Sequence, residues 1–378
     1  MNAKRTPPRR PKPLVTQGEA RSRSRGRADA PTVRTRSKAA RHPIVVFLNF
    51  MLFLVVMGII GGVAALVIGR EAFVTAGPLT ETVQVNIPRG ASVQSIARGL
   101  EEQEIISNRY VFMAAAYASG ATKAMKAGEY VIDAGESMEG VLSKIVSGAV
   151  VQHKITIAEG LSSAQVVARL NESDVLTGRI RQIPPEGSLL PETYSVTRGM
   201  DRERVLKMMQ DAHTTALNEI WQARDQEIPV ASPADLVTLA SIIEKETGQA
   251  EERDRVAAVF VNRLNRRMRL QSDPTILYGL YGGDAWAQGR TIYRSDLDRP
   301  NPYNTYQIAA LPPGPIANPG REALKAAANP AETDELYFVA DGTGGHAFAR
   351  TYEEHQQNVA RWREIERQRR AATAGSTE

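Results

Sequence analysis

The chain has 378 residues, of which 42% are hydrophobic and 24% are charged, and this ordinary composition excludes a wholly disordered protein. A net charge of +5 and a pI near 9.4 would suit a nucleic-acid binder, but residues 1–41 hold thirteen Lys or Arg and only two acids. Taking these from the totals of 47 and 42 leaves 34 bases against 40 acids, so we expect no nucleic-acid partner for the mildly acidic remainder.

Residues 1–42 form a basic tail that is rich in Pro, Ser and Arg and has no apolar periodicity. We expect this tail to be disordered, because it buries too little to offset its ordering entropy. Residues 43–69 are apolar except for Asn49 and carry no charge, which predicts a single transmembrane helix. The cations before it place the tail in the cytoplasm and the rest of the chain outside. The alternative is a cleaved signal peptide ending near Ala76, although signal h-regions are usually only about 7 to 15 residues long.

An internal repeat follows the apolar segment. The sequence from Val85 to Ile106 aligns without gaps to that from Ile155 to Leu176, and a weaker third copy contains Gly135 and Ser137. In each copy a strand is expected to lead through a Gly turn to a helix that a Ser caps. This short βα pattern resembles LysM modules, small βααβ folds that bind N-acetylglucosamine-containing glycans. A plain spacer without a ligand remains open.

We assign residues 80–152 to the LysM-like module and 153–230 to the second repeat with a connecting segment. Within the connecting segment, residues 180–199 are rich in Pro, Gly and Ser and predict loops. The apolar spacing from Arg202 to Trp221 then predicts a helix with one core-packing face.

The stretch ASIIEKETG, Ala240 to Gly248, places acids directly after an apolar run. Ser232 as cap and Pro233 as first residue predict a helix that runs to about Thr247 and stops at Gly248. Helical projection turns Glu246 toward the apolar stripe, Lys245 toward solvent and Glu244 to an intermediate position.

A carboxyl against apolar side chains should have a raised pKa and could serve as a general acid. Alternatively, both glutamates pair with Lys245 or Arg253 at a solvated helix end.

Residues 251–266 predict a second amphipathic helix, and Asp273 with Pro274 predicts the cap and first residue of a third. The loop that follows combines aromatic and amide side chains suited to sugars. The candidate substrate-binding residues are Gln271, Ser272, Asp273, Tyr303, Asn304, Tyr306 and His346. The five histidines lack the spacing of a zinc site, and the sequence contains neither a P-loop nor a GxSxG motif, so we expect no metal and no cofactor.

The motifs ASIIEKET, ERDRVAAVFVNRL, MRLQSDPT, YNTY, LPPGPIANPG and YFVADGTGGHAF, with EGSLLPETY before them, together resemble the endolytic murein transglycosylases, the YceG-like or MltG family. The resemblance runs from about Val83 to Trp362. It implies an α+β chain with one transmembrane helix, LysM-like βα modules and a mainly helical, lysozyme-like catalytic domain, which we place at residues 231–365, before a disordered tail at 366–378.

In these relatives the catalytic Glu is followed by Ser or Thr, which Glu246 and Thr247 match and Glu244 does not. The resemblance implies that Glu246 acts first as acid and then as base on the bond between N-acetylmuramic acid and N-acetylglucosamine, leaving 1,6-anhydro ends, with Glu244 and Thr247 supporting it. It also implies inner-membrane localisation with a periplasmic catalytic domain, peptidoglycan strands as substrate, and penicillin-binding synthases as possible partners. A water-using muramidase and a non-catalytic peptidoglycan-binding scaffold remain alternatives.

Overall fold

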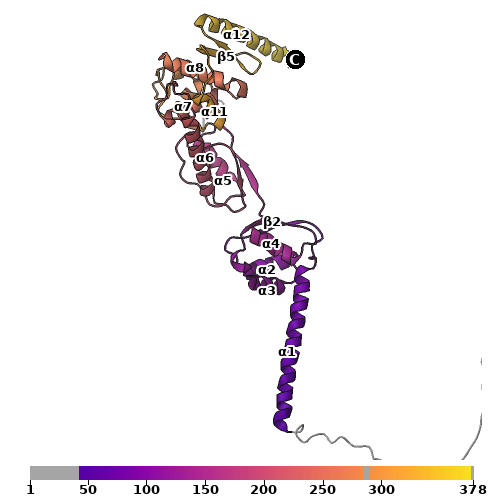
Figure 1. The fold of residues 1–378 in the computed structure, drawn as a ribbon. Coiled ribbons are helices and arrows are strands. Elements are labelled where there is room, and N and C mark those ends of the chain that lie inside the picture. Colours follow the sequence, from indigo (N-terminus) through magenta and orange to yellow (C-terminus); the bar gives the residue numbers. More distant parts are fainter. Residues whose placement is uncertain (1–41, 284–289, 376–378) are drawn as a thin grey trace, which may run out of the picture. The chain divides into compact units, whose positions relative to one another are not determined.

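The computed structural model describes residues 42–283 and 290–375. Within these ranges the protein is a mixture of helices and three two-stranded antiparallel sheets (Figure 1). It divides into two units, one ending at Val67 and the other beginning at Ile68. The tail predicted to be disordered, residues 1–42, lies outside the described residues except for His42.

Helix α1 (Pro43–Val74) contains the whole apolar run of residues 43–69. It is the one described helix that is long and apolar enough to cross a membrane. Its last two turns, from Ile68 to Val74, belong to the second unit, where Ala72 and Phe73 pack against a hydrophobic core. The predicted span is therefore present as one continuous helix.

The first βα body packs two strands against three helices. Strand β1 pairs antiparallel with β2, and buried residues of β1, β2, α2, α3 and α4 form one core. Its elements are β1 (Val83–Ile87), α2 (Val93–Glu102), α3 (Arg109–Ala118), the 3₁₀ turn η2 (Ala121–Lys123), β2 (Gly128–Ile132) and α4 (Met138–Ser147).

A second βα body begins with the same strand, glycine turn and serine-capped helix as the first. Helices α2 and α5 begin at Val93 and Ser163 and have equal lengths. The turns before them use Gly90 (φ 76°) and Gly160 (φ 73°), and Ser92 and Ser162 each accept a capping hydrogen bond. The predicted strand, turn and helix are confirmed here, and also in the third copy. The elements are β3 (His153–Thr156), α5 (Ser163–Glu172), β4 (Thr193–Val196) and α6 (Arg202–Gln222).

Helix α6 connects two hydrophobic cores. Val205 and Met209 pack in the core of the second βα body, whereas Ala216 and Ile220 pack in that of the following helices. A helix of 21 residues is long enough to serve both. The predicted boundary at residue 230 therefore does not separate the two cores. The loop predicted at residues 180–199 also contains strand β4, which pairs with β3.

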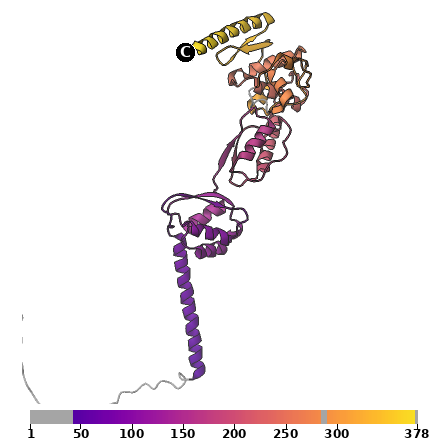
Figure 2. The same cartoon turned by 180° about the vertical axis from the view of Figure 1, so that it is seen from behind.

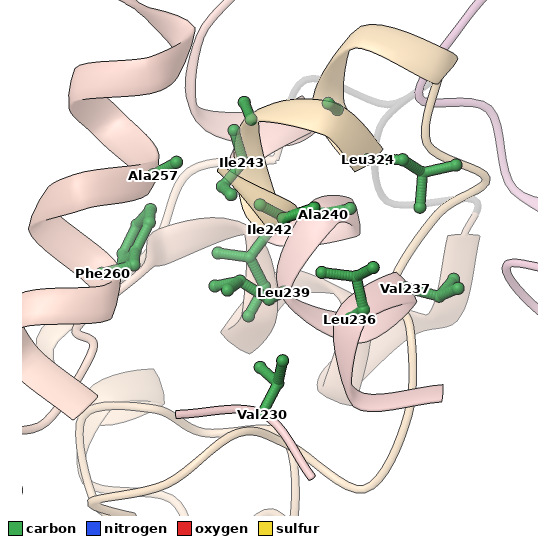
Figure 3. Packing of buried hydrophobic residues seen from close by; sticks show 14 of the residues in the cluster. Val230, Leu236, Val237, Leu239, Ala240, Ile242, Ile243, Ala257, Phe260 and Leu324 are labelled. Carbon is green, nitrogen blue, oxygen red and sulfur yellow. The ribbon is translucent and has the colours of Figure 1, made fainter. Parts of the chain in front are cut away.

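The helical region is built around α7. Eight consecutive residues, Leu236 to Ile243, are buried. Around them lie Val230, which precedes α7, two residues of α8 (Ala257 and Phe260), and Leu324 of α11 (Figure 3). The elements are α7 (Pro233–Glu246), η3 (Ala250–Glu252), α8 (Arg253–Asn265), α9 (Asp273–Tyr281), α10 (Arg294–Leu297) and α11 (Arg321–Ala328).

The predicted helix ends need two corrections. Ser232 caps α7 and Pro233 opens it, as predicted, but α7 ends at Glu246 because Thr247 has extended backbone (φ −138°), before Gly248 is reached. Ser272 precedes α9, so Asp273 is its first residue and not its cap.

The chain ends with a hairpin, β5 (Tyr337–Ala340) and β6 (His346–Ala349), and helix α12 (Tyr352–Gly375). Helix α12 lies along the hairpin in both views (Figures 1 and 2). The prediction of disorder at 366–378 is wrong as far as Gly375. Pairs such as Glu364–Arg367 and Glu366–Arg370 support this largely exposed helix at i,i+3 and i,i+4 spacing. Residues 376–378 lie outside the described part.

Candidate active site

Glu246 is the last residue of α7. Its side chain is half-buried, and burial raises the pKa of its carboxyl to about 7. The nearby Ser272 hydroxyl and Arg263 lower this pKa, whereas Asp273 raises it. A carboxyl with this proton affinity can donate a proton near neutral pH and take one back.

The prediction that Lys245 faces solvent is wrong. Lys245 is half-buried, and its Nζ donates a hydrogen bond of 3.3 Å to the carbonyl of Gly160. The projection assumed one apolar face, but α7 is enclosed on every side along Leu236–Ile243, which is the arrangement of a central helix. Its polar residues are satisfied internally, since Ser241 Oγ donates to the Thr238 carbonyl and accepts from Ile316 N.

Glu244 points to the start of α11. Its Oε2 accepts a hydrogen bond of 3.0 Å from Gly320 N. Burial raises the pKa of this carboxyl and the charge of Glu159 raises it further, while the Gly320 bond lowers it. Glu244 therefore joins α7 to the start of α11.

Thr247 turns the chain at the end of α7. It is buried, and its Oγ1 accepts a hydrogen bond of 3.0 Å from Gln249 N. This bond fixes the backbone directly after Glu246.

Ser272 is buried beside Glu246, with 1% of its surface exposed. Its N–H donates to Thr305 Oγ1 over 2.9 Å, but its own Oγ is buried without a hydrogen-bond partner. Although this hydroxyl lies close enough to lower the pKa of Glu246, the pair does not reach hydrogen-bond geometry. An unsatisfied buried hydroxyl is costly, so Ser272 Oγ is available to a bound hydroxyl or amide.

Gln271 and Asp273 flank this serine and are exposed. Gln271 has a positive φ of 54°, a conformation that is uncommon outside glycine and that occurs at functional sites. Its N–H donates to the Thr305 carbonyl over 3.2 Å. Asp273 Oδ1 accepts a hydrogen bond of 2.7 Å from Tyr306 OH.

Tyr306 donates a hydrogen bond to Asp273 and is influenced by Glu246. Burial, the bond to Asp273 and the charge of Glu246 all raise its pKa. The structure thus brings Glu246, Ser272, Asp273 and Tyr306 into one group.

Three other predicted binding residues have their own partners. Asn304 is fully buried, and its amide donates to the carbonyls of Leu297 (3.0 Å) and Arg299 (3.1 Å). Tyr303 packs against Tyr278 with ring centres 5.0 Å apart. His346 Nδ1 lies 2.8 Å from Glu252 Oε2, and its N–H donates to the same carboxyl. Asn304 and His346 therefore stabilise their loops.

Two charged residues were not singled out from the sequence. Burial raises the pKa of Glu186, which accepts hydrogen bonds from Ser163 N (2.7 Å) and Asn318 Nδ2 (3.2 Å). Arg263 is 7% exposed and its charge acts on Glu246. The only signal for Glu186 is an acid at the start of EGSLLPETY, and Arg263 resembles any other base on an amphipathic helix.

Within the described ranges, no group of three or more His, Cys, Asp or Glu is arranged to hold a metal ion.

A family model described as the YceG-like family matches residues 85–361. The chain is 33% identical over 309 residues to an endolytic murein transglycosylase of Bacillus subtilis (strain 168), covering 73% of this chain and 83% of that one. It is 29% identical over 324 residues to one of Streptococcus pneumoniae serotype 2 (strain D39 / NCTC 7466), covering 74% of this chain and 58% of that one. A crystal structure of a YceG-like protein from Listeria monocytogenes is 29% identical, covers 73% of this chain and 98% of that one, and has a TM-score of 0.46.

Proposed function

The chain belongs to the YceG-like family, and on that premise we propose that it is a membrane-anchored endolytic lytic transglycosylase of peptidoglycan in which Glu246 is the single acid and base. The carrying observation is the raised pKa of Glu246, about 7, beside the unpartnered hydroxyl of Ser272. The curated relatives bear the name endolytic murein transglycosylase, which agrees with this chemistry.

The first half of the reaction uses the protonated carboxyl. Glu246 donates its proton to the oxygen between N-acetylmuramic acid and N-acetylglucosamine, and the bond from that oxygen to the muramic C1 breaks. The leaving sugar departs with a new hydroxyl, and positive charge develops on C1 and the ring oxygen. Glu246 is now a carboxylate.

The second half uses that carboxylate as a base. It removes the proton from the C6 hydroxyl of the same muramic sugar, and O6 forms a bond to C1. The product is a 1,6-anhydro end, Glu246 is protonated again, and no water is consumed. A single carboxyl suffices because the nucleophile, the C6 hydroxyl, belongs to the substrate.

The residues around Glu246 receive distinct roles in this proposal. Ser272 Oγ binds a substrate hydroxyl or acetamido group, and exposed Gln271 and Asp273 line the same side. Tyr306 holds Asp273, while Tyr303 offers an aromatic wall. Glu244 and Thr247 fix the two sides of the helix end, and Asn304 and His346 support the loops around it.

Helix α1 is the proposed anchor, with the basic tail in the cytoplasm and the βα bodies and helical region in the periplasm. The two βα bodies are the proposed LysM-like part, and the region from α7 onward is the proposed lysozyme-like catalytic part. A substrate of newly made glycan strands close to the membrane makes penicillin-binding synthases the proposed partners.

The test is the chemistry of the products. The full chain in detergent is incubated with peptidoglycan, and the fragments are identified by mass spectrometry. Anhydro ends should form with wild-type protein and with Glu227→Gln, an exposed acid in the segment before α7, and should fall by at least about a hundredfold with Glu246→Gln. Reducing ends would instead indicate a muramidase, and binding without cleavage a scaffold.

A further inference from the structure

Arg263 places a positive charge inside the helical region. Only 7% of its surface is exposed. Its Nε donates to the Leu336 carbonyl over 2.6 Å, and its Nη1 donates to the Leu270 carbonyl over 2.6 Å. The guanidinium carbon also lies 5.4 Å from the centre of the Tyr337 ring. The carbonyls accept hydrogen bonds from the Arg263 guanidinium and the ring packs near it, but these groups are neutral and do not cancel its positive charge.

The two carbonyl partners lie directly before two separate segments, one of which carries candidate site residues. Leu270 directly precedes Gln271, Ser272 and Asp273, and Leu336 directly precedes β5. Because the guanidinium is a rigid planar fork, its two bonds fix the distance between these segments. Arg263 thus holds the start of α9 in the place where the Ser272 hydroxyl faces Glu246.

The charged groups that act on Glu246 come from different elements and have opposite signs. Asp273 of α9 disfavours the carboxylate form of Glu246, and Arg263 of α8 favours it. Tyr306 is coupled to these groups, since its hydroxyl donates to Asp273 and its pKa is raised by the charge of Glu246 and lowered by that of Arg263. Burial lowers the pKa of Arg263, whereas Tyr337, Glu246 and Tyr306 raise it, and Glu246 is the carboxyl among these described groups. The charge of Arg263 also lowers the pKa of His355 of α12.

We propose that Arg263 is a positioning residue of this reaction: its buried cation stabilises the carboxylate that Glu246 becomes at mid-reaction, and its hydrogen bonds hold Ser272 and Asp273 against that carboxylate. The proposal rests on the function proposed above. An enzyme with one carboxyl needs Glu246 protonated at the start and ionised halfway. Arginine cannot release its proton in a protein, so its charge remains constant while that of Glu246 changes.

Two substitutions separate charge from anchoring. Arg263→Gln removes the cation and keeps a shorter donor, whereas Arg263→Lys keeps the cation and loses the fork. Asp273→Asn removes the opposing charge from Glu246 and leaves Arg263 in place. All three are compared with wild-type protein by circular dichroism and thermal unfolding before activity is measured.

The first readout is the pH dependence of kcat for release of anhydro ends. The fall of the rate at high pH follows ionisation of Glu246, so its midpoint should rise by about one pH unit in Arg263→Gln and fall in Asp273→Asn. Arg263→Lys should keep the wild-type midpoint even where kcat drops, and KM should change less than kcat. Equal loss of kcat in both Arg263 variants with an unmoved midpoint would mean a purely structural arginine and would overturn the proposal.

The second readout does not depend on turnover. The carboxyl of Glu246 is titrated by difference infrared spectroscopy, with Glu246→Gln as the blank that assigns the signal. Its midpoint should move in the same directions as the kinetic midpoint. If Arg263→Gln does not fold, Arg263→Lys and Asp273→Asn decide: a midpoint that moves in Arg263→Lys, or one that does not fall in Asp273→Asn, overturns the opposed-charge arrangement. If Glu246→Gln still releases anhydro ends, the proposed function fails, while the titration still reports whether Arg263 acts on Glu246.

Discussion

A glutamic acid whose pKa is raised from 4.5 to about 7 in the folded protein binds more protons when folded than when unfolded across that interval. The free energy of unfolding therefore falls as the pH rises from about 4.5 to about 7, and the full destabilisation is present above pH 7. A shift of this size corresponds to roughly 3 kcal/mol. Replacing Glu246 by Gln removes an ionisation that burial opposes.

Glu246→Gln is accordingly expected to unfold at a higher temperature than wild-type protein at pH 8, and the difference should vanish near pH 4.5. Because Glu186 and Glu244 are present in both proteins, their own titrations cancel in the comparison. Thermal melts at several pH values check this. A difference that stays constant with pH would show that Glu246 is not titrating in this interval.

At the scale of single residues, the local sequence pattern predicts the environment of Glu246 but not the roles of Asn304, His346 and Arg263. Placement after an apolar run was enough to predict a raised pKa for Glu246, and burial raises it in the structure. The roles of Asn304 and His346 depend on the carbonyls of Leu297 and Arg299 and on the carboxyl of Glu252. Residue type does not reveal such partners, and the same holds for the buried cation of Arg263.

At the scale of elements, the loop before β4 must pass close to α7. Gly187 has a φ of 74°, and a Cβ added there would lie 2.6 Å from Pro315 Cγ and 2.9 Å from Val237 Cγ1. Gly199 has a similar φ of 80° but open space around it. The two glycines share the backbone strain that alanine would suffer, and only Gly187 adds a collision.

Gly187→Ala should therefore destabilise the protein more than Gly199→Ala. The left-handed conformation costs about 1 to 2 kcal/mol at either position, and overpacking adds about 1 to 3 kcal/mol at Gly187 alone. Melting temperatures of the two variants measure the difference. Equal losses would indicate that Pro315 moves aside freely.

Elements were largely predictable because their signals are local. The capping serines, the positive-φ glycines and the apolar spacing lie within a few residues of each other, and they located α2, α5, α6 and α7. Strand β4 was missed because Thr193–Val196 is extended through pairing with β3, a partner far away in the sequence. The solvent-facing prediction for Lys245 failed because neighbouring helices enclose α7, which its own sequence does not show.

At the scale of the whole molecule, the proposed topology can be tested cleanly because the chain contains no cysteine. Ser24→Cys marks the basic tail, and Ser143→Cys marks an exposed position on α4. A maleimide that cannot cross the inner membrane should label Ser143→Cys in intact cells, and Ser24→Cys only after lysis. The reverse pattern would refute the orientation, and labelling of both in intact cells would refute the anchor.

The order of tail, apolar helix, repeats and helical region along the chain is predictable from composition and repeats, whereas the residues at which these regions begin and end are not. The apolar run and the offset repeat are visible by inspection, but α6 serves two cores and α12 continues to Gly375. Both corrections concern helices whose extent depends on neighbours or on repeated charge pairs.

The enclosure of α7 also has a consequence for natural and engineered variation. A helix at a protein surface tolerates substitutions with a period of 3.6, because one face is free. From Leu236 to Ile243 α7 has no free face, so a library of single substitutions should show one unbroken block of intolerance there. Adaptation to a different glycan is thus expected to proceed through Gln271, Asp273 and the loop that holds Tyr303 and Tyr306, while α7, which carries Glu246, stays unchanged.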